Sequence, residues 1–279
     1  MLQLIYVELV KIFSKPRSYI GFLAVTSVIL LIQFAMYIDG KNYLDFMLQT
    51  MRQSFDIGGN ILNGHLVCFI ILQTLIMQMP LMVALVTGDL ISGEAASGTM
   101  RLLATKPYSR AQILWAKYAA GAIYTVALIL WLGILALGLS RLIFGHGDII
   151  VLKTDSLVIV RDADLLWRFY SAFFIAILSL LLVASFSLML SCFTDNSIGP
   201  IIVSMSVIIV FTIIGTLEVP VFDYIKPLLF TTHMVIWRNM FDDPLPLKQI
   251  AVSISVLVLH ILVFSGVSFY YFTRKDIQS

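Results

Sequence analysis

The sequence is poor in charge. Only 12% of its 279 residues are Asp, Glu, Lys or Arg, whereas 60% are hydrophobic. Soluble domains usually carry about 25% charged residues, and the mean hydropathy of this chain is +0.98. The net charge of +2 is too small to favour binding to nucleic acid. This composition indicates a membrane protein.

Residues that carry catalysis or bind metals are also scarce. Cys68 and Cys192 lie inside apolar runs, which favours buried free thiols over a disulfide or a metal pair. The four histidines are dispersed and no H-E-x-x-H motif occurs, so we expect no metal site. No G-x-x-x-x-G-K-[S/T] motif occurs, so the chain should bind no ATP through a phosphate loop. We therefore expect neither a cofactor nor an enzymatic activity of the chain by itself.

Long apolar runs dominate the sequence instead. A helix needs about 20 mostly apolar residues to cross a bilayer. Six stretches meet this requirement, at roughly 19–38, 66–88, 113–143, 169–192, 199–217 and 250–272. Backbone groups in hydrocarbon must bond within their own segment, so all six should be helices. The expected fold is an all-α integral membrane protein in which residues 1–279 form a single membrane domain.

The charges between the spans predict an orientation. With the N-terminus inside, the cytoplasmic segments hold nine Lys and Arg against five acids, and the outer segments hold nine against eleven. The cytoplasmic segments are shorter, so their basic density is higher. This asymmetry favours a multi-pass protein of the inner (cytoplasmic) membrane with both termini in the cytoplasm.

Residues 1–17 predict an amphipathic helix ahead of the first span. Glu8, Lys11 and Lys15 share one face, and Glu8 can pair with Lys11 three residues later. Pro16 should end the helix, since it lacks an N–H. We expect the helix to lie in the cytoplasmic interface of the membrane; an ordinary anchoring flank is the alternative. The other face is apolar and carries Leu2, Ile5, Tyr6, Leu9, Ile12 and Phe13.

The loop 89–112 is the longest connection on the cytoplasmic side. The loop contains Gly93 and Gly98, and an apolar cluster with an adjacent arginine follows them. We expect a short coupling helix there that docks on a partner; the alternative is a loop that packs on its own bundle. Ser109 and Gln112 predict a capping box for the third span. The cluster and its arginine are Met100, Arg101, Leu102 and Leu103.

Glu94 precedes this segment. Its carboxylate could accept hydrogen bonds from the first N–H groups of the short helix that follows. Alternatively, it could pair with Arg101 or Arg110. Either arrangement would make the loop rigid.

Several of these residues occur together in one known family. The chain resembles type-2 ABC transporter permeases in the order of its loop elements, in an E-x-x-K pattern at its N-terminus and in its charged tail. The loop elements are Gly93-Glu94, Ser97-Gly98-Thr99, Leu102-Leu103, Pro107-x-Ser109-Arg110 and Lys117. The N-terminal pair is Glu8 and Lys11, and the tail holds Phe272, Arg274, Lys275 and Asp276.

The resemblance implies the membrane-spanning subunit of an ATP-driven exporter. It implies a dimer with a second copy or a paralogue, and a separate nucleotide-binding subunit that holds ATP and Mg²⁺. Coupling to that ATPase would fall to Gly93, Glu94, Gly98, Thr99, Met100, Arg101, Leu102 and Leu103. The resemblance also places a re-entrant helical hairpin at 218–249; a docking loop for a periplasmic partner is the alternative there.

Polar residues within the spans are candidates for the translocation path: Gln73, Thr74, Gln78 and Ser204. For each of them, a hydrogen bond that holds the helix bundle is the alternative. Pro80 could kink the second span. The segment 144–168 has strand-like runs that the sequence does not assign.

Two other functions remain open at this point. One is a non-transporting anchor or scaffold of an envelope machine, and the other is an ion-coupled secondary carrier. A carrier usually needs ionisable residues within the membrane, and no acid lies at mid-membrane depth in these spans. The transported substrate is not readable from the sequence.

Overall fold

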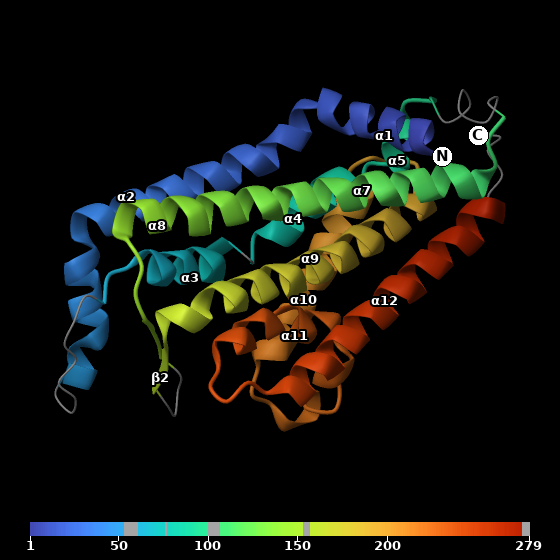
Figure 1. The fold of residues 1–279 in the computed structure, drawn as a ribbon. Helices are drawn as coiled ribbons and strands as arrows, with labels where there is room; N and C mark the ends of the chain where they lie inside the picture. The colour runs from blue at the N-terminus through green and yellow to red at the C-terminus, as the bar shows by residue number, and fades with distance from the viewer. Residues whose placement is uncertain (53–60, 76, 100–106, 153–156, 275–279) are drawn as a thin grey trace.

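The computed structural model describes residues 1–52, 61–75, 77–99, 107–152 and 157–274. Five helical segments in it are long and apolar enough to cross a membrane. They are the Pro16–Phe46 part of α2 (Pro16–Arg52), the continuous run of α7 (Arg110–Gly133), η1 (Ile134–Leu139) and α8 (Ser140–Phe144), then α9 (Asp162–Phe193), α10 (Gly199–Thr216) and α12 (Leu247–Arg274). The chain is therefore a mainly helical, multi-pass membrane protein (Figure 1).

The predicted second span is a bent pair of helices. α3 (Gly64–Leu75) and α4 (Met79–Thr87) meet at 52° and count as a sixth span only if they are taken together. Pro80 lies in the first turn of α4, where its missing N–H costs nothing. A straight helix through this point would leave the carbonyl four residues earlier without a donor. The apolar run thus continues in the sequence while the helix does not.

The first span is longer than predicted. The sequence places a loop at 39–65, but α2 continues as a helix to Arg52. Leu44 lies in this extension and is buried. Figure 1 shows α2 running along the bundle and then turning at its far end.

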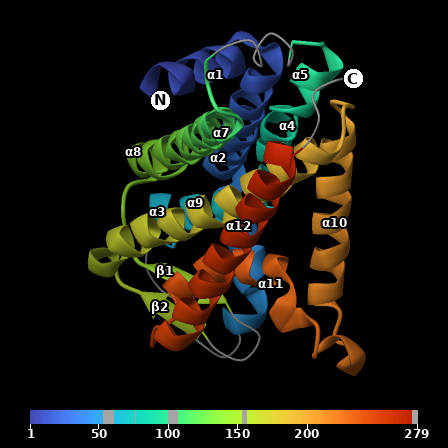
Figure 2. The same cartoon turned by 90° about the vertical axis from the view of Figure 1, so that its right-hand side faces the viewer.

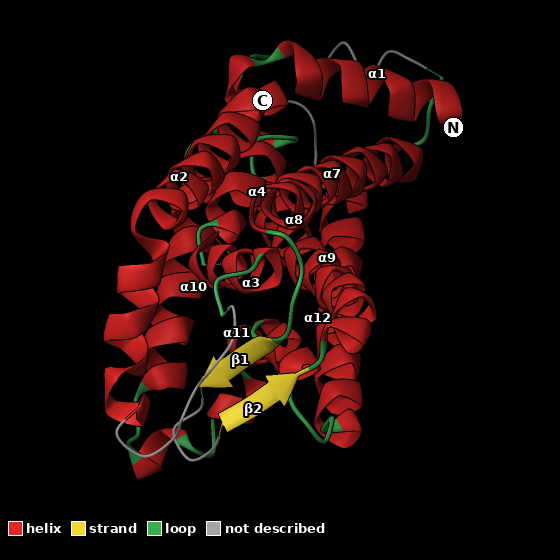
Figure 3. Ribbon diagram, turned by 60° about the vertical axis from the view of Figure 1, so that its left-hand side comes forward, coloured by secondary structure: helices red, strands yellow, loops and turns green. Residues whose placement is uncertain are grey.

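The mainly helical fold also contains one small β-hairpin. β1 (Ile149–Leu152) and β2 (Leu157–Val160) form an antiparallel hairpin in which Ile149 pairs with Val160. Ile149, Val151, Val158 and Val160 are buried, so one face of the hairpin packs on the protein. The alternation of buried and exposed residues explains why this segment looked strand-like. Figure 3 shows the hairpin below the helices, far from α1.

The region between α10 and α12 forms four short helices. They are η2 (Pro220–Phe222), η3 (Lys226–Leu228), α11 (Phe230–Met234) and η4 (Ile236–Phe241). Trp237 and Phe241 are fully buried, and Phe241 packs edge-on against Phe69 and Phe169. Arg168 of α9 donates hydrogen bonds to the carbonyls of Met240 and Asp242. The region is therefore a folded cap; whether it enters the membrane stays a prediction.

Candidate functional site where α1, α5 and α7 meet

α1 (Leu2–Ser14) and α5 (Ser92–Ala96) meet the start of α7 at the end of the bundle near the chain termini (Figures 1 and 2). The corner between α1 and α2 is fixed by hydrogen bonds. Lys15 is extended (φ −91°, ψ 130°), as expected before Pro16. The Ser18 hydroxyl donates to the carbonyl of Ile12, and the Tyr124 hydroxyl of α7 donates to the carbonyl of Ser18 at 3.0 Å. α1 is thus held against α7.

Four charged side chains close a ring at this junction. Lys117 Nζ lies 2.8 Å from Glu8 Oε2 and 2.7 Å from Glu94 Oε2. Lys11 Nζ lies 2.7 Å from Glu8 Oε1 and 2.8 Å from Glu94 Oε1. Each carboxylate therefore contacts both ammonium groups, and each ammonium group contacts both carboxylates. The ring joins α1, α5 and α7 through ion pairs and hydrogen bonds.

The ring is largely dry. Lys117 is 0% exposed and Glu8 is 1% exposed. Burial by itself raises the pKa of the Glu8 carboxyl, but Lys117 and Lys11 outweigh it and leave the pKa below 4.5. Burial lowers the pKa of Lys11, but its bonds to Glu8 and Glu94 outweigh that effect and leave the pKa above 10.5. The net effect therefore favours the charged forms of Glu8 and Lys11.

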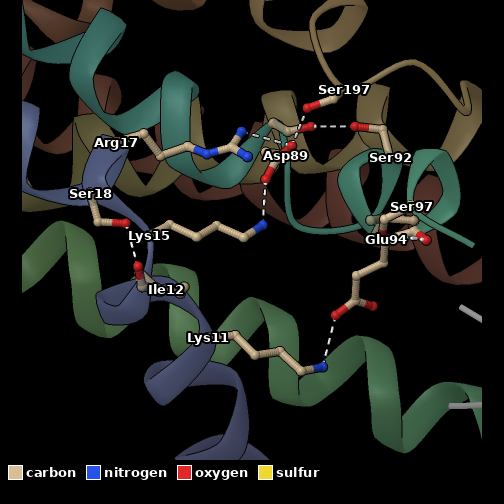
Figure 4. Close-up of polar contacts among 12 residues, drawn as sticks. Lys11, Ile12, Lys15, Arg17, Ser18, Asp89, Ser92, Glu94, Ser97 and Ser197 are labelled. Atoms are coloured by element: carbon tan, nitrogen blue, oxygen red, sulfur yellow. Dashed lines mark hydrogen bonds and ion pairs between the residues drawn. The ribbon is translucent and has the colours of Figure 1, made fainter. Parts of the chain in front are cut away.

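A second cluster lies one turn further along the chain (Figure 4). Asp89, which follows α4, is 2.8 Å from Lys15 Nζ and 2.8 Å from Arg17 Nη1. The hydroxyl of Ser197, in the connection between α9 and α10, donates to the same carboxylate. Gly93 lies against Asp89, and a Cβ at position 93 would overlap the carboxylate. Glycine is required there because of this contact.

Two serines of α9 hold the end of α4 and the start of α5. The Ser191 hydroxyl accepts hydrogen bonds from the backbone N–H groups of Ile91 and Ser92 at 3.2 and 2.8 Å. The Ser187 hydroxyl bonds to that of Thr87, at the end of α4. After α5 the chain turns at Gly98, whose φ of +70° is unfavourable for any residue with a Cβ. α5 is therefore anchored independently of the ring.

The predicted coupling residues divide into two groups. Gly93 and Glu94 lie within α5, and Gly98 and Thr99 form the turn after it. Met100, Arg101, Leu102 and Leu103 lie outside the described residues, so the predicted helix at 97–103 is described only in its first three residues, which form a turn. The capping box of Ser109 and Gln112 at the start of α7 is confirmed.

Of the arrangements predicted for Glu94, the structure describes only the pairing with Arg110, and that pairing is absent. Its ion-pair partners are Lys11 and Lys117, not Arg110, and Arg101 lies outside the described residues. Glu94 lies inside α5, and most of the segment expected to form the following helix lies outside the described residues. Two ammonium groups lie within 3 Å of the Glu94 carboxylate, so it is paired without Arg110.

The predicted path residues do not share one surface. Gln73, Thr74 and Gln78 are exposed at the bend between α3 and α4. Ser204 is fully buried in α10, and its hydroxyl donates to the carbonyl of Ile201 in the same helix. The bend also places Thr74 and Gln78 on different helical segments. The structure therefore brings the first three together and leaves Ser204 apart; whether they line a path stays a prediction.

Apart from the pair of Glu8 with Lys11, sequence reasoning missed how these charges are paired. The sequence singled out Lys117 only through the family resemblance, and it gave no role to Asp89 or Arg17. A usable signal was present, because Glu8, Lys11 and Lys15 recur at helical spacing directly before a proline. A charged face on an otherwise apolar helix requires oppositely charged partners from other elements. Nothing in the sequence indicates which residues supply them.

The ring predicts a defined pH dependence. The pKa of Glu8 is lowered by folding, so Glu8 contributes to folding stability above a pH of about 4.5. This contribution is lost as the pH falls through the pKa of Glu8 in the folded protein. The pKa of Lys11 is raised, so its contribution is present below about 10.5 and is lost as the pH rises through the folded value. We expect the thermal midpoint in detergent to be flat between these limits and to fall outside them. Glu8→Gln should measurably reduce the fall of the thermal midpoint at acid pH. If the midpoint of this variant falls at acid pH as much as that of the wild type, the ion pairs assigned to Glu8 are contradicted.

The described residues show no metal site and no disulfide. No group of three or more His, Cys, Asp and Glu that could hold a metal ion occurs in the described part of the chain. Cys68 and Cys192 are both buried and free, as predicted. The geometry of the ring is suited to a mechanical role, because charges that join three helices can transmit displacement from one helix to the others.

The chain is similar to a curated protein and matches a family model. Over 203 residues the chain is 25% identical to the protein named Uncharacterized protein YhcI of Bacillus subtilis (strain 168). The aligned region covers 70% of this chain and 63% of that protein, so the chain spans less than two thirds of the relative's length. The model of the family described as "Protein of unknown function (DUF2705)" matches residues 22–278. This match includes Asp89, Glu94 and Lys117 and begins after α1. Because it extends over most of the sequence, the chain belongs to the DUF2705 family.

Proposed function

We propose that the chain is the permease subunit of an ATP-driven ABC transporter, acting as an exporter with a separate ATPase subunit and a second permease. The observation that carries the proposal is the charged ring. It connects α5, at the start of the loop, to α7 through Glu94 and Lys117, and to α1 through Glu94 and Lys11. A force applied to this loop would reach a spanning helix and α1 together.

The path of the chain supports six crossings. α3 starts beside the end of α8, where the Gly64 N–H donates to the carbonyl of Gly145. The pair α3–α4 then ends near Asp89, which contacts Lys15 and Arg17 at the opposite end of the bundle. Arg110 donates to the carbonyl of Thr273, so α12 ends where α7 begins. An even number of crossings returns the chain to the side on which it started.

The same geometry supports the proposed orientation. α1, α5 and the end of α12 lie together, and their basic residues favour the cytoplasmic side of an inner membrane. An ATPase subunit in the cytoplasm would meet the loop 97–109 on this face. The alternative of an ion-coupled carrier has less support, because the two acids of the ring are already paired with lysines.

The proposal is tested by complex formation. The chain would be co-expressed with the phosphate-loop ATPase encoded beside it, purified by a tag on the chain and assayed for ATP hydrolysis in lipid. We expect a stoichiometric complex that hydrolyses ATP. Replacing Leu102 and Leu103 by Ser should reduce recovery of the ATPase at least about tenfold, since apolar anchors dominate such interfaces.

Replacing Leu142 by Ser provides a matched control. Leu142 is an exposed leucine of α8 at the opposite end of the bundle, and this variant should keep the complex intact. Normal ATPase recovery with the double variant would remove the loop from the interface. Failure to recover any ATPase with the wild-type chain would favour an anchor or scaffold.

A further inference from the structure

A groove with a volume of about 910 Å³ lies between α1 and the turn after α5. One wall is mainly apolar and is formed by Leu4, Tyr6 and Val7 of α1. The opposite wall carries the hydroxyls of Ser97, Thr99 and Tyr108. The groove therefore offers an apolar side and a polar side to the same ligand.

Two lysines also line the groove. Lys11 and Lys15 lie one helical turn apart, and their side chains are 37% and 41% exposed. An ammonium group has three hydrogens to donate. Lys11 donates to Glu8 and Glu94, and Lys15 donates to Asp89, so one and two hydrogens respectively remain for a ligand. Both lysines can therefore bind an anion without leaving their carboxylates.

The charge balance favours an anionic ligand. The ring and the Asp89 cluster together contain four cations, Lys11, Lys15, Arg17 and Lys117. They contain three carboxylates, Glu8, Asp89 and Glu94, so one positive charge is in excess. An anion in the groove would neutralise this excess, whereas a cation would add to it.

The apolar wall continues onto the outer face of α1. Leu2 and Tyr6 are 84% and 69% exposed, and Val10 is also exposed. Figure 3 shows α1 at the edge of the bundle. An exposed apolar face beside a cationic groove is the arrangement that contacts acyl chains and a headgroup at once.

We propose that this groove binds the headgroup of an anionic phospholipid, with the phosphate on Lys11 and Lys15 and the acyl chains along Tyr6 and Val7. The lipid would fix α1 at the membrane surface and fill the space between α1 and the loop. The proposal needs α1 to lie at a lipid surface but needs no ATPase partner. It therefore stands independently of the transport function.

Lipid retention measured by native mass spectrometry tests the proposal. The full chain would be extracted from membranes of equal phosphatidylglycerol and phosphatidylcholine. We expect one retained phosphatidylglycerol per chain, with a preference over phosphatidylcholine of about tenfold, as one charge-assisted hydrogen bond would give. Equal retention of the two lipids would overturn the proposal.

Two variants test whether the lipid is retained in the groove rather than elsewhere on the protein. Lys15→Gln should lower phosphatidylglycerol retention at least about fivefold, while Asp89 keeps its contacts with Arg17 and Ser197. Val7→Trp should lower it similarly by filling the groove and leaves every charge in place. Lys226→Gln is the control, since Lys226 also makes a single ion pair, with Asp223, but lies outside the groove. Unchanged retention in both groove variants would overturn the site.

Two further outcomes identify other occupants. Displacement of the lipid by millimolar glycerol 3-phosphate would show that a soluble phosphate is the ligand and would overturn the lipid assignment. Loss of the ATPase subunit in Val7→Trp with phosphatidylglycerol retention unchanged would place a protein in the groove. Resistance to the soluble phosphate together with loss of lipid in both variants is the expected result.

Discussion

Replacing Lys117 by Met should destabilise the protein more than any other single change at the ring. Methionine matches the length of lysine but removes the only fully buried cation of the ring. Glu8 and Glu94 would then share Lys11 alone, which leaves one uncompensated negative charge in a dry site. Breaking a buried ion pair by removing one partner costs about 3–5 kcal/mol. We expect the thermal midpoint in detergent to fall on the order of 10 °C.

A second substitution distinguishes charge from packing. In the double variant Glu8→Gln with Lys117→Met, one charge of each sign is absent and the remaining Lys11–Glu94 pair is balanced. We expect it to recover part of the loss, by about 1–3 kcal/mol, because the unpaired carboxylate is gone. Lys226→Met serves as the control, since its pair with Asp223 is more exposed and should be worth about 0–1 kcal/mol. Equal falls for Lys117→Met and Lys226→Met would show that the ring does not stabilise the fold.

The parts of the fold that were predictable depend on local sequence. The last four predicted spans match the α7–η1–α8 run, α9, α10 and α12 to within a few residues at their ends, because hydropathy over 20 residues reports burial in lipid directly. Pro16 ends α1, and Ser109 caps α7, because both effects act within a few residues. The pairing of Glu8 with Lys11 is confirmed for the same reason.

The candidate site was not predictable in the same way. Glu8, Glu94 and Lys117 are far apart in the sequence, and no periodicity connects them. The break in the second span lies inside an unbroken apolar run, where hydropathy cannot distinguish one helix from two. The extension of α2 is polar enough to resemble a loop, although it is helical. Long-range pairing and backbone geometry determine these features, and neither appears in a composition profile.

Replacing Glu94 by Ala should separate ATP hydrolysis from transport while the protein stays folded and inserted. Ser191 would still bond to the backbone N–H groups of Ile91 and Ser92, so α5 would remain attached to α9. Its connections to α1 and α7 would be lost, because both run through the Glu94 carboxylate. If the chain is the proposed permease, a push on the loop would no longer reach the spanning helices together. We expect transport in proteoliposomes to fall about tenfold at an unchanged rate of ATP hydrolysis, within the range of typical coupling energies.

A structural measurement keeps this prediction informative even if the transport proposal fails. Hydrogen–deuterium exchange of the isolated chain should be faster in α5 for Glu94→Ala and nearly unchanged for Glu94→Gln, because the amide retains part of the hydrogen bonding of the carboxylate. Asp223→Ala is the matched control, since it removes an exposed carboxylate that also pairs with a lysine. Unchanged exchange in α5 would show that the ring does not hold the loop. Faster exchange with transport and hydrolysis both normal would instead mean that the ring holds the loop but does not transmit its motion.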